Sequence, residues 1–438
     1  MSIRSAFNGT SLAVGILLSV GLGACAPAAP AAPTAPPAAA TAGANVSGTA
    51  AAAAPTAAAA AKPVATAAAQ AAPTLAAAAA TGVASVAGPI KIGMFAPISG
   101  DAAAQGKSAK DGLDMAVDEA NSGGGVLGQQ VQATAEDDAG KPEQAVSICT
   151  RFVSQDKVTV VIGGISSPTS LACSEVTEKA RVPQIITGGT AARITQRGDK
   201  YIFRIPVPDT NLGGDVARFA NKQGWMKIAF LHVNDDFGNG GVQAVKDAMA
   251  KLGGMEAVDD ESYTRGDKDF TAQLTKIKQA RPDALVEWSR YAEGALIAQQ
   301  IQDLGMGSIP HIGSDGFSQP QYIDLGGAAV EGVYYTAHWD ISNPDPTSKA
   351  WVDAFQKKFN RPPDPFNAQT YTAVKVGLDA IKRAGTTDTD KVRDAIAATK
   401  DLPTPMGAIS FNDNGDPNYP TFMMQVKDGK PTVVQGRG

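Results

Sequence analysis

From residue 89 onward, the chain shows two hydrophobic periodicities that alternate with each other. Residues 91–99 form a short apolar run, which predicts a buried β-strand. In the next segment, 109–121, the apolar residues Leu113, Ala116 and Ala120 recur at helical spacing and fall on one face. The folded part of the chain is therefore expected to begin with a strand followed by an amphipathic helix.

The same alternation of strands and helices continues almost to the end of the chain. In the first half it predicts strands at 131–135, 158–163, 183–187 and 201–206 and helices at 142–154 and 168–180. A second run predicts helices at 210–223, 241–252, 270–280 and 293–304 and strands at 227–233, 261–264, 284–289 and 311–314. A strand at 333–336 then precedes helices at 346–359 and 367–384, which are expected to cover the first sheet. Segments 408–411 and 422–426 are expected to form a hairpin-like return around Asn414 and Gly415.

Alternating strands and helices with short connections predict an α/β fold whose parallel sheets are covered on both faces. About 350 residues are more than one hydrophobic core usually serves, so we expect two lobes. Because chain that leaves one lobe must return to complete its sheet, we expect crossovers near Pro206, Ala337 and Met406. The expected N-terminal lobe comprises residues 89–206 with 338–406, and the expected C-terminal lobe comprises 207–337 with 407–438.

The first 25 residues have the pattern of an export signal. Arg4 precedes an apolar run at 12–24 that is shorter than the ~20 residues needed to cross a bilayer but suits a signal-peptide core. The run ends at Leu22-Gly23-Ala24-Cys25, which resembles the bacterial lipobox and implies a lipid anchor at Cys25. The alternative is an ordinary secretory signal followed by an incidental cysteine. Both interpretations place the protein outside the cytoplasm, and the first attaches it to the cell membrane.

Residues 26–88 consist almost entirely of Ala, Pro, Thr and Gly, with Lys62 as the one charged residue and no aromatic residue. Such a segment cannot bury enough apolar surface to offset chain entropy, so we expect a disordered tether. A flexible chain of about 60 residues has a root-mean-square reach of roughly 45 Å. The tether would therefore hold a folded domain away from the membrane while keeping it nearby.

The net charge limits the possible partners of the protein, and the cysteine content bears on a possible disulfide. The net charge of -5 and the isoelectric point near 5.4 argue against a nucleic-acid partner, since such proteins carry basic patches. After Cys25 the chain contains Cys149 and Cys173, an even pair that favours a disulfide in an oxidising compartment. Spacing alone does not show that their Cβ atoms face each other, so two buried free thiols remain an equal alternative.

Two glycine-rich segments resemble nucleotide-binding motifs but depart from them. Residues 123–128 contain G-x-G-x-x-G, yet they follow a predicted helix and precede a strand, which is the reverse of a dinucleotide-binding loop. Gly100 and Gly106 are one residue too far apart for a phosphate-binding loop, and Asp101 between them would repel phosphate. The sequence therefore predicts no nucleotide cofactor.

The sequence support for a catalytic site or a metal site is similarly weak. Segment 164–168 places a serine after a strand but lacks the second glycine of a nucleophile elbow. His232, His311 and His338 are the chain's three histidines, and their positions fit neither a zinc site nor a catalytic triad. We therefore expect a binding protein, not an enzyme, with no cofactor and no metal.

Small polar loops follow two strands of the first lobe, at the sheet edge where open α/β folds bind ligands. Ser166 and Ser167 precede Pro168 at a predicted helix start, where hydroxyls and free amides would hold a carboxylate. Ser167 alternatively caps its own helix. Loop 187–190, which contains Gly188, Gly189 and Thr190, offers backbone amides and a hydroxyl after the next strand, or forms a plain glycine turn.

Aromatic and charged residues follow three strands of the second lobe. Phe237, Arg290 with Tyr291, and Asp315 come directly after the predicted strands 227–233, 284–289 and 311–314. Aromatic side chains beside one carboxylate suit a ligand that has an ammonium group and an apolar part. For a single aromatic residue, local packing is the alternative.

Taken in order, several segments resemble the leucine/isoleucine/valine-binding family of type I periplasmic binding proteins, the receptors of branched-chain amino-acid ABC transporters. The resemblance runs from about residue 89 to 438 and is carried by IKIGMFAPISGDAAAQGKSAKDG, ANSGGGVLGQQVQ with EDDAGKPEQAV, VVIGGISSPTS, ITGGTAARIT, VNDDFGNGG and MGAISFNDNGD. It implies two Rossmann-like lobes that close on a ligand about a hinge and then dock on a transporter permease.

The resemblance also implies roles for individual residues. Ser167 and Thr190 would hold the ligand carboxylate, the backbone of Gly188 and Gly189 would help bind the amino group, and Asp315 would be its counter-ion. Phe237 and Tyr291 would close over the ligand. The family usually has tyrosine at position 237 and often glutamate at 315, its 188–190 loop is one residue longer, and Arg290 is unusual.

These departures widen the choice of ligand beyond branched-chain and related amino acids. An aromatic acid, a dicarboxylate, an amide or a urea-like ligand is the alternative, and so is a sensory receptor with the same fold. An exported α/β enzyme would need a nucleophile and a base that folding brings together.

Overall fold

The structure is a computed structural model, and it describes residues 88–436. The expected signal peptide, the lipid-anchor Cys25 and almost all of the tether lie outside the described residues. Within residues 88–436, no helix is both long enough and apolar enough to cross a bilayer. The same residues contain no group of three or more His, Cys, Asp or Glu side chains arranged to hold a metal ion.

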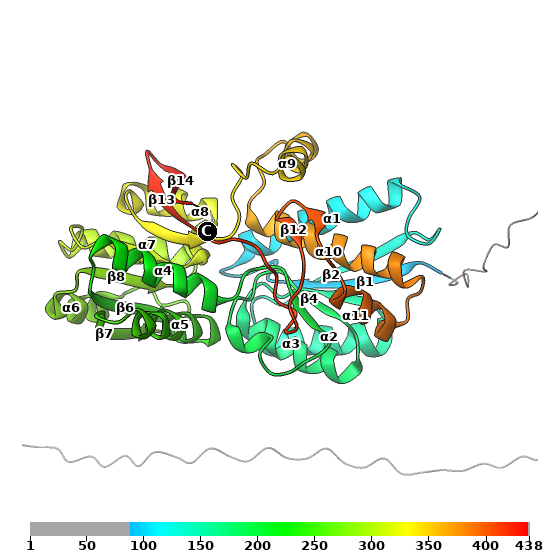
Figure 1. Cartoon of the computed structure of the whole chain (residues 1–438), viewed down its shortest axis with the longest axis horizontal. Helices are drawn as coiled ribbons and strands as arrows, with labels where there is room; N and C mark the ends of the chain where they lie inside the picture. Colours follow the sequence, from blue (N-terminus) through cyan, green and yellow to red (C-terminus); the bar gives the residue numbers. More distant parts are fainter. Residues whose placement is uncertain (1–87, 437–438) are drawn as a thin grey trace, which may run out of the picture. The chain divides into compact units, whose positions relative to one another are not determined.

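The first sheet has five parallel strands in the order β2-β1-β3-β4-β5. Figure 1 labels three of them, β1, β2 and β4. These strands are β1 (Ile90–Ala96), β2 (Val131–Asp137), β3 (Val160–Ile162), β4 (Gln184–Ile186) and β5 (Ile202–Arg204). The helices of this part are α1 (Ala103–Ser122), α2 (Pro142–Arg151), α3 (Ser167–Ala180), α9 (Pro346–Phe359), α10 (Pro365–Ala384) and α11 (Thr389–Ala397).

Alternate residues of the first sheet belong to two different cores. Met94 and Ile162 share one buried cluster with residues of α1 and α10, whereas Phe95 and Val161 share another with residues of α2 and α3. Because successive side chains of a strand point to opposite faces, the two helix pairs cover opposite faces of the sheet. The expectation that the helix at 367–384 covers the first sheet is therefore confirmed.

The second sheet has seven strands in the order β14-β13-β10-β9-β8-β6-β7. Its parallel strands are β6 (Lys227–Val233), β7 (Glu256–Tyr263), β8 (Ala284–Trp288), β9 (His311–Gly313) and β10 (Tyr334–Ala337). Strands β13 (Phe422–Lys427) and β14 (Lys430–Gln435) extend this sheet in antiparallel orientation. The accompanying helices are α4 (Asp209–Gln223), α5 (Asp236–Leu252), α6 (Thr271–Ala280), α7 (Tyr291–Asp303) and α8 (Pro320–Gly326).

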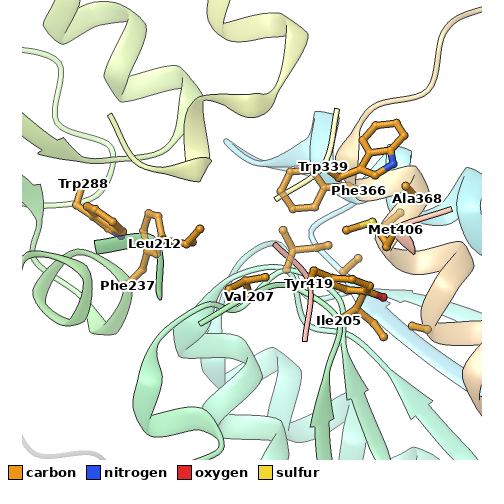
Figure 2. Packing of buried hydrophobic residues seen from close by; sticks show 14 of the residues in the cluster. Ile205, Val207, Leu212, Phe237, Trp288, Trp339, Phe366, Ala368, Met406 and Tyr419 are labelled. Atoms are coloured by element: carbon orange, nitrogen blue, oxygen red, sulfur yellow. The ribbon is translucent and has the colours of Figure 1, made fainter. Parts of the chain in front are cut away.

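The chain passes between the two lobes three times, from β5 to α4, from β10 to α9, and from β12 (Gly407–Ile409), a strand outside both sheets, to β13. Residues beside these passages share one buried cluster: Ile205, Val207, Trp339, Met406 and Tyr419 (Figure 2). The Trp339 Nε1–H donates to the Pro405 carbonyl oxygen at 2.9 Å, which ties the second passage to the third. The fold class predicted from the sequence, two α/β lobes joined by three crossovers, is confirmed; the residue boundaries of the lobes stay a prediction.

One predicted pairing is wrong: segments 408–411 and 422–426 do not form a hairpin. Strand β12 pairs with β11 (Leu402–Thr404), and β13 pairs with β10 and β14. The turn at Asn414 and Gly415 exists, but the Gly415 carbonyl oxygen accepts from the Arg204 N–H of β5 at 3.0 Å. The turn is thus held against the first sheet, which separates the two segments that the pattern had paired.

Cys149 of α2 and Cys173 of α3 form a disulfide, with Cα atoms 5.8 Å apart. The bond closes a loop with a sequence separation of 24 residues, for which chain entropy predicts a stabilisation of about 3 kcal/mol. Replacing both cysteines with alanine is expected to lower the free energy of unfolding by about this amount in urea titrations.

Reductant provides the internal control for this experiment. Dithiothreitol should lower the urea midpoint of the wild-type protein and leave that of the double variant unchanged. Equal midpoints for the oxidised wild type and the double variant would contradict a stabilising role for the bond.

Candidate functional site

A small cavity of about 30 Å³ lies between strand-end loops of the two lobes. Its lining includes these predicted residues: Ser166, Ser167, Gly188, Phe237, Arg290 and Asp315. Gln105, Ile165, Gly316 and Phe366 complete the lining, and the sequence analysis did not single them out. Gly189, Thr190 and Tyr291 do not line this cavity.

The start of α3 forms one wall of the cavity. Ser166, not Ser167, caps this helix, because its Oγ accepts from the Thr169 N–H at 3.4 Å and lies 2.9 Å from the Thr169 hydroxyl. The Ser167 Oγ accepts instead from the Ala191 N–H at 3.2 Å. The alternative in which Ser167 caps its own helix is therefore wrong, and the Ser167 hydroxyl connects α3 to the 187–191 loop.

The 187–191 loop requires glycine at two positions. A Cβ atom on Gly188 would meet the Ile165 carbonyl oxygen at 2.5 Å, and one on Gly189 would meet the Ser170 Oγ at 2.6 Å. The Gly188 N–H donates to the Gly164 carbonyl oxygen at 3.0 Å, so this amide is already used within the protein. The two glycines let the loop lie against α3 at close range.

Arg204, which the sequence analysis did not identify, holds this loop from behind. Its side chain is fully buried and forms an ion pair with Asp416, at 2.6 Å between Nε and Oδ1. Its Nη1 donates to the carbonyl oxygens of Thr190 and Ala191, both at 2.9 Å, and its Nη2 donates to the Thr195 hydroxyl. The guanidinium thus joins the site loop to the third passage of the chain.

Asp209, at the start of α4, is a second buried charge near the site. Its N–H donates to the Thr190 carbonyl oxygen at 2.9 Å. Burial raises the pKa of the Asp209 carboxyl well above its ordinary value, and the negative charge of Asp315 raises it further. A charged residue between the apolar residues Phe203 and Ile205 was the sequence signal for Arg204.

The second lobe contributes a cation, an aromatic ring and a carboxylate. The Asp235 Oδ1 caps α5 by accepting from the N–H groups of Phe237 and Gly238, and its Oδ2 accepts from Arg290 Nη2 at 2.8 Å. The Arg290 guanidinium lies 5.2 Å from the centroid of the Phe237 ring. Asp235 therefore positions both Phe237 and Arg290 at the cavity.

Asp315 begins a short 3-10 turn (Asp315–Ser318) directly after β9. Burial raises the pKa of its carboxyl to about 7, and the nearby Arg290 charge opposes this rise. Its Oδ1 is buried and has no hydrogen-bond partner among the described residues. The carboxylate can consequently accept a proton or a ligand donor near neutral pH.

Contacts outside the cavity also join the two lobes. The Tyr291 hydroxyl donates to the Asp101 carbonyl oxygen at 2.9 Å, and the Arg265 Nη1 donates to the Gly140 carbonyl oxygen at 3.1 Å. Arg193 forms an ion pair with Asp236 at 2.7 Å. These contacts hold the two lobes together at points other than the cavity lining.

Comparison with known proteins gives consistent matches over the folded part. The chain matches the model of the family described as Periplasmic binding protein over residues 89–431. It is 33% identical over 344 residues to the Leu/Ile/Val-binding protein homolog 3 of Brucella melitensis, covering 78% of this chain and 92% of that protein.

Solved structures agree with this match. The leucine binding protein LivK of Thermotoga maritima is similar with a TM-score of 0.75 and 30% identity, over 79% of this chain and 97% of that one. A solute binding protein of an ABC transporter from Rhodopseudomonas palustris, in complex with 3,4-dihydroxy benzoic acid, is similar with a TM-score of 0.72 and 25% identity, over 79% and 96%. The resemblance predicted from the sequence is confirmed.

Proposed function

Since the chain belongs to the periplasmic binding protein family, which works outside the cytoplasm, we propose that it is the receptor of an ABC importer for an amino-acid-like ligand. The observation that carries this proposal is the cavity between the lobes, where a helix start on one side faces a buried carboxylate on the other. The names of the relatives describe binding proteins, which supports a receptor over an enzyme.

The two walls suit the two ends of an amino acid. On the first lobe, the hydroxyls of Ser166 and Ser167 lie at the start of α3, where the helix dipole favours a carboxylate. On the second lobe, Asp315 provides a carboxylate for an ammonium group, and Phe237 provides an apolar face. A zwitterion that bridges the walls satisfies buried groups of both lobes.

Ligand access requires the lobes to separate. A cavity of about 30 Å³ holds roughly one water molecule, which is less than any amino acid needs. Because ligand contacts from both lobes exist together only when the lobes approach each other, binding shifts the population toward the closed form. The closed form would then dock on the transporter permease.

The anchoring of the receptor is part of the same proposal. Cys25 would carry the lipid, and residues 26–88 would link the lipid to the folded lobes. A tether of this kind keeps the receptor concentrated near its permease without fixing its orientation. Detergent partitioning of the wild-type protein and a Cys25→Ser variant expressed in bacteria would test the anchor.

Calorimetric titration of the chain from residue 26, which lacks the proposed signal peptide and Cys25, with amino acids, dicarboxylates and aromatic acids tests the ligand class. Replacing Ser167 with alanine is expected to weaken binding about ten- to a hundredfold, because it removes a hydrogen bond to a charged group. Ser174→Ala is the matched control: Ser174 is buried in the same helix, but its hydroxyl donates to the Leu171 carbonyl oxygen. The ligand should be recovered unchanged after incubation. Equal affinities for both variants, or turnover of the ligand, would count against the proposal.

A further inference from the structure

Arg290 occupies a position where its charge is locally unfavourable. It is the N-cap residue of α7, so its cation lies at the helix end that carries the positive partial charge of the dipole. Its side chain is also buried, with 9% of its surface exposed. A buried cation at this position is consistent with a role in the site, since local preferences alone would select Ser, Thr, Asp or Asn.

Among the described residues, only some of the N–H donors of this guanidinium have a hydrogen-bond partner. Nη2 donates to Asp235, and the Phe237 ring lies beside the group. Nη1 is buried and has no hydrogen-bond partner among the described residues. A buried charged donor without a partner costs free energy. The ion pair with Asp235 uses Nη2, so Nη1 can still donate to another acceptor. Because Arg290 lines the cavity, a bound ligand can supply the missing acceptor.

The remaining lining shows which part of a ligand would reach this donor. The start of α3 on the first lobe can already bind one carboxylate, and Asp315 can bind an ammonium group. Besides Ser166 and Ser167, Gln105 of α1 adds a further polar side chain from the first lobe. A purely aliphatic side chain would leave the Arg290 donor unsatisfied and would cover it with apolar surface.

Resting on the proposed receptor function, we propose that Arg290 selects amino acids whose side chain ends in an oxygen acceptor, either a carboxylate or a carboxamide. The charge of Arg290 is already balanced by Asp235, so both a charged and a neutral acceptor fit the same donor. The preferred ligands are then of the glutamate and glutamine class, and leucine, isoleucine and valine bind more weakly.

Calorimetric titration of the chain from residue 26 with glutamate, glutamine, leucine and valine tests this inference. We expect the wild-type protein to bind glutamate or glutamine at least tenfold more tightly than leucine. Replacing Arg290 with methionine should weaken binding of that preferred amino acid at least tenfold and change the affinity for leucine less than threefold. Arg383→Met, which removes an arginine paired with Asp379 on α10, is the matched control and should change none of these affinities.

A second variant separates selectivity from folding. Arg290→Met leaves Asp235 without its partner, so we would also measure Arg290→Met/Asp235→Asn, in which asparagine keeps the cap of α5. The same loss of preference in both variants supports the inference.

Two results would overturn the inference and leave the receptor function intact. One is tighter binding of leucine than of glutamate and glutamine by the wild type. The other is an equal loss for all four amino acids in Arg290→Met, which would assign Arg290 to the common head group. If the wild-type protein bound none of the amino acids or acids tested, the proposed function would fail together with the inference.

Discussion

Replacing Asp315 with asparagine is expected to weaken amino-acid binding about a hundredfold at pH 8 and to remove most of its pH dependence. The ligand ammonium needs an ionised partner, and burial raises the pKa of the Asp315 carboxyl to about 7. In the wild-type protein, affinity should therefore rise by up to about tenfold per pH unit from pH 5 to 7 and level off above. Titrations at several pH values, each in two buffers of different ionisation enthalpy, would measure this slope and the accompanying proton release.

The stability of the ligand-free protein should depend on pH in the opposite direction to the affinity: it should fall as the pH rises. A carboxyl group whose pKa is higher in the folded than in the unfolded protein contributes stability that is complete below about pH 4 and is lost as the pH rises through about 7. Thermal unfolding of the wild type should thus lose more stability between pH 4 and 7 than that of Asp315→Asn. Asp303→Asn, an exposed substitution at the end of α7, serves as the control. An unchanged affinity in Asp315→Asn would reject the counter-ion assignment.

Replacing Arg204 with methionine is expected to lower the free energy of unfolding by about 3–5 kcal/mol, because it leaves Asp416 as an uncompensated buried charge. The loss should appear in urea titrations as a lower midpoint. Ligand affinity should fall as well, since the Thr190 and Ala191 carbonyl oxygens lose the group that fixes their loop.

The double variant Arg204→Met/Asp416→Asn separates the effect of an unpaired Asp416 charge from the effect of losing the Arg204 side-chain contacts. Removing both charges should recover part of the lost stability, because no carboxylate then remains buried without a partner. Recovery of stability without recovery of affinity would show that the guanidinium positions the loop. A change below about 1 kcal/mol in Arg204→Met would contradict a central role for this ion pair.

The central strands were predicted well because buried strands are rich in apolar residues, and such runs can be recognised in the sequence. Strands β6 and β8 are mostly apolar, although β6 contains His232 and β8 contains Glu287, as expected for parallel strands covered on both faces. Helix starts were predicted less well. The helix expected at 241–252 begins at Asp236, because the Asp235 side chain caps an opening segment with glycines at 238, 240 and 241, which the apolar pattern does not reveal.

The candidate site was predicted in part for a similar reason. Residues directly after strands, such as Ser167, Phe237 and Asp315, reach the cavity because parallel strands end at one edge of a sheet. Gln105 and Phe366 were missed, since each stands in a helix and reaches the cavity only through the packing of α1 and α10. The short elements α8 and α11 were missed because they carry too few apolar positions for a period to be recognised.

The contact of Arg204 with Asp416 and Gly415 has a consequence for biosynthesis. The first lobe depends on residues that lie more than 200 positions downstream of Arg204, so it cannot complete its folding before that later segment has been synthesised. The contact would thus make completion of the first lobe depend on prior synthesis of the elements α4 to β10, which lie between Arg204 and Asp416 in the sequence.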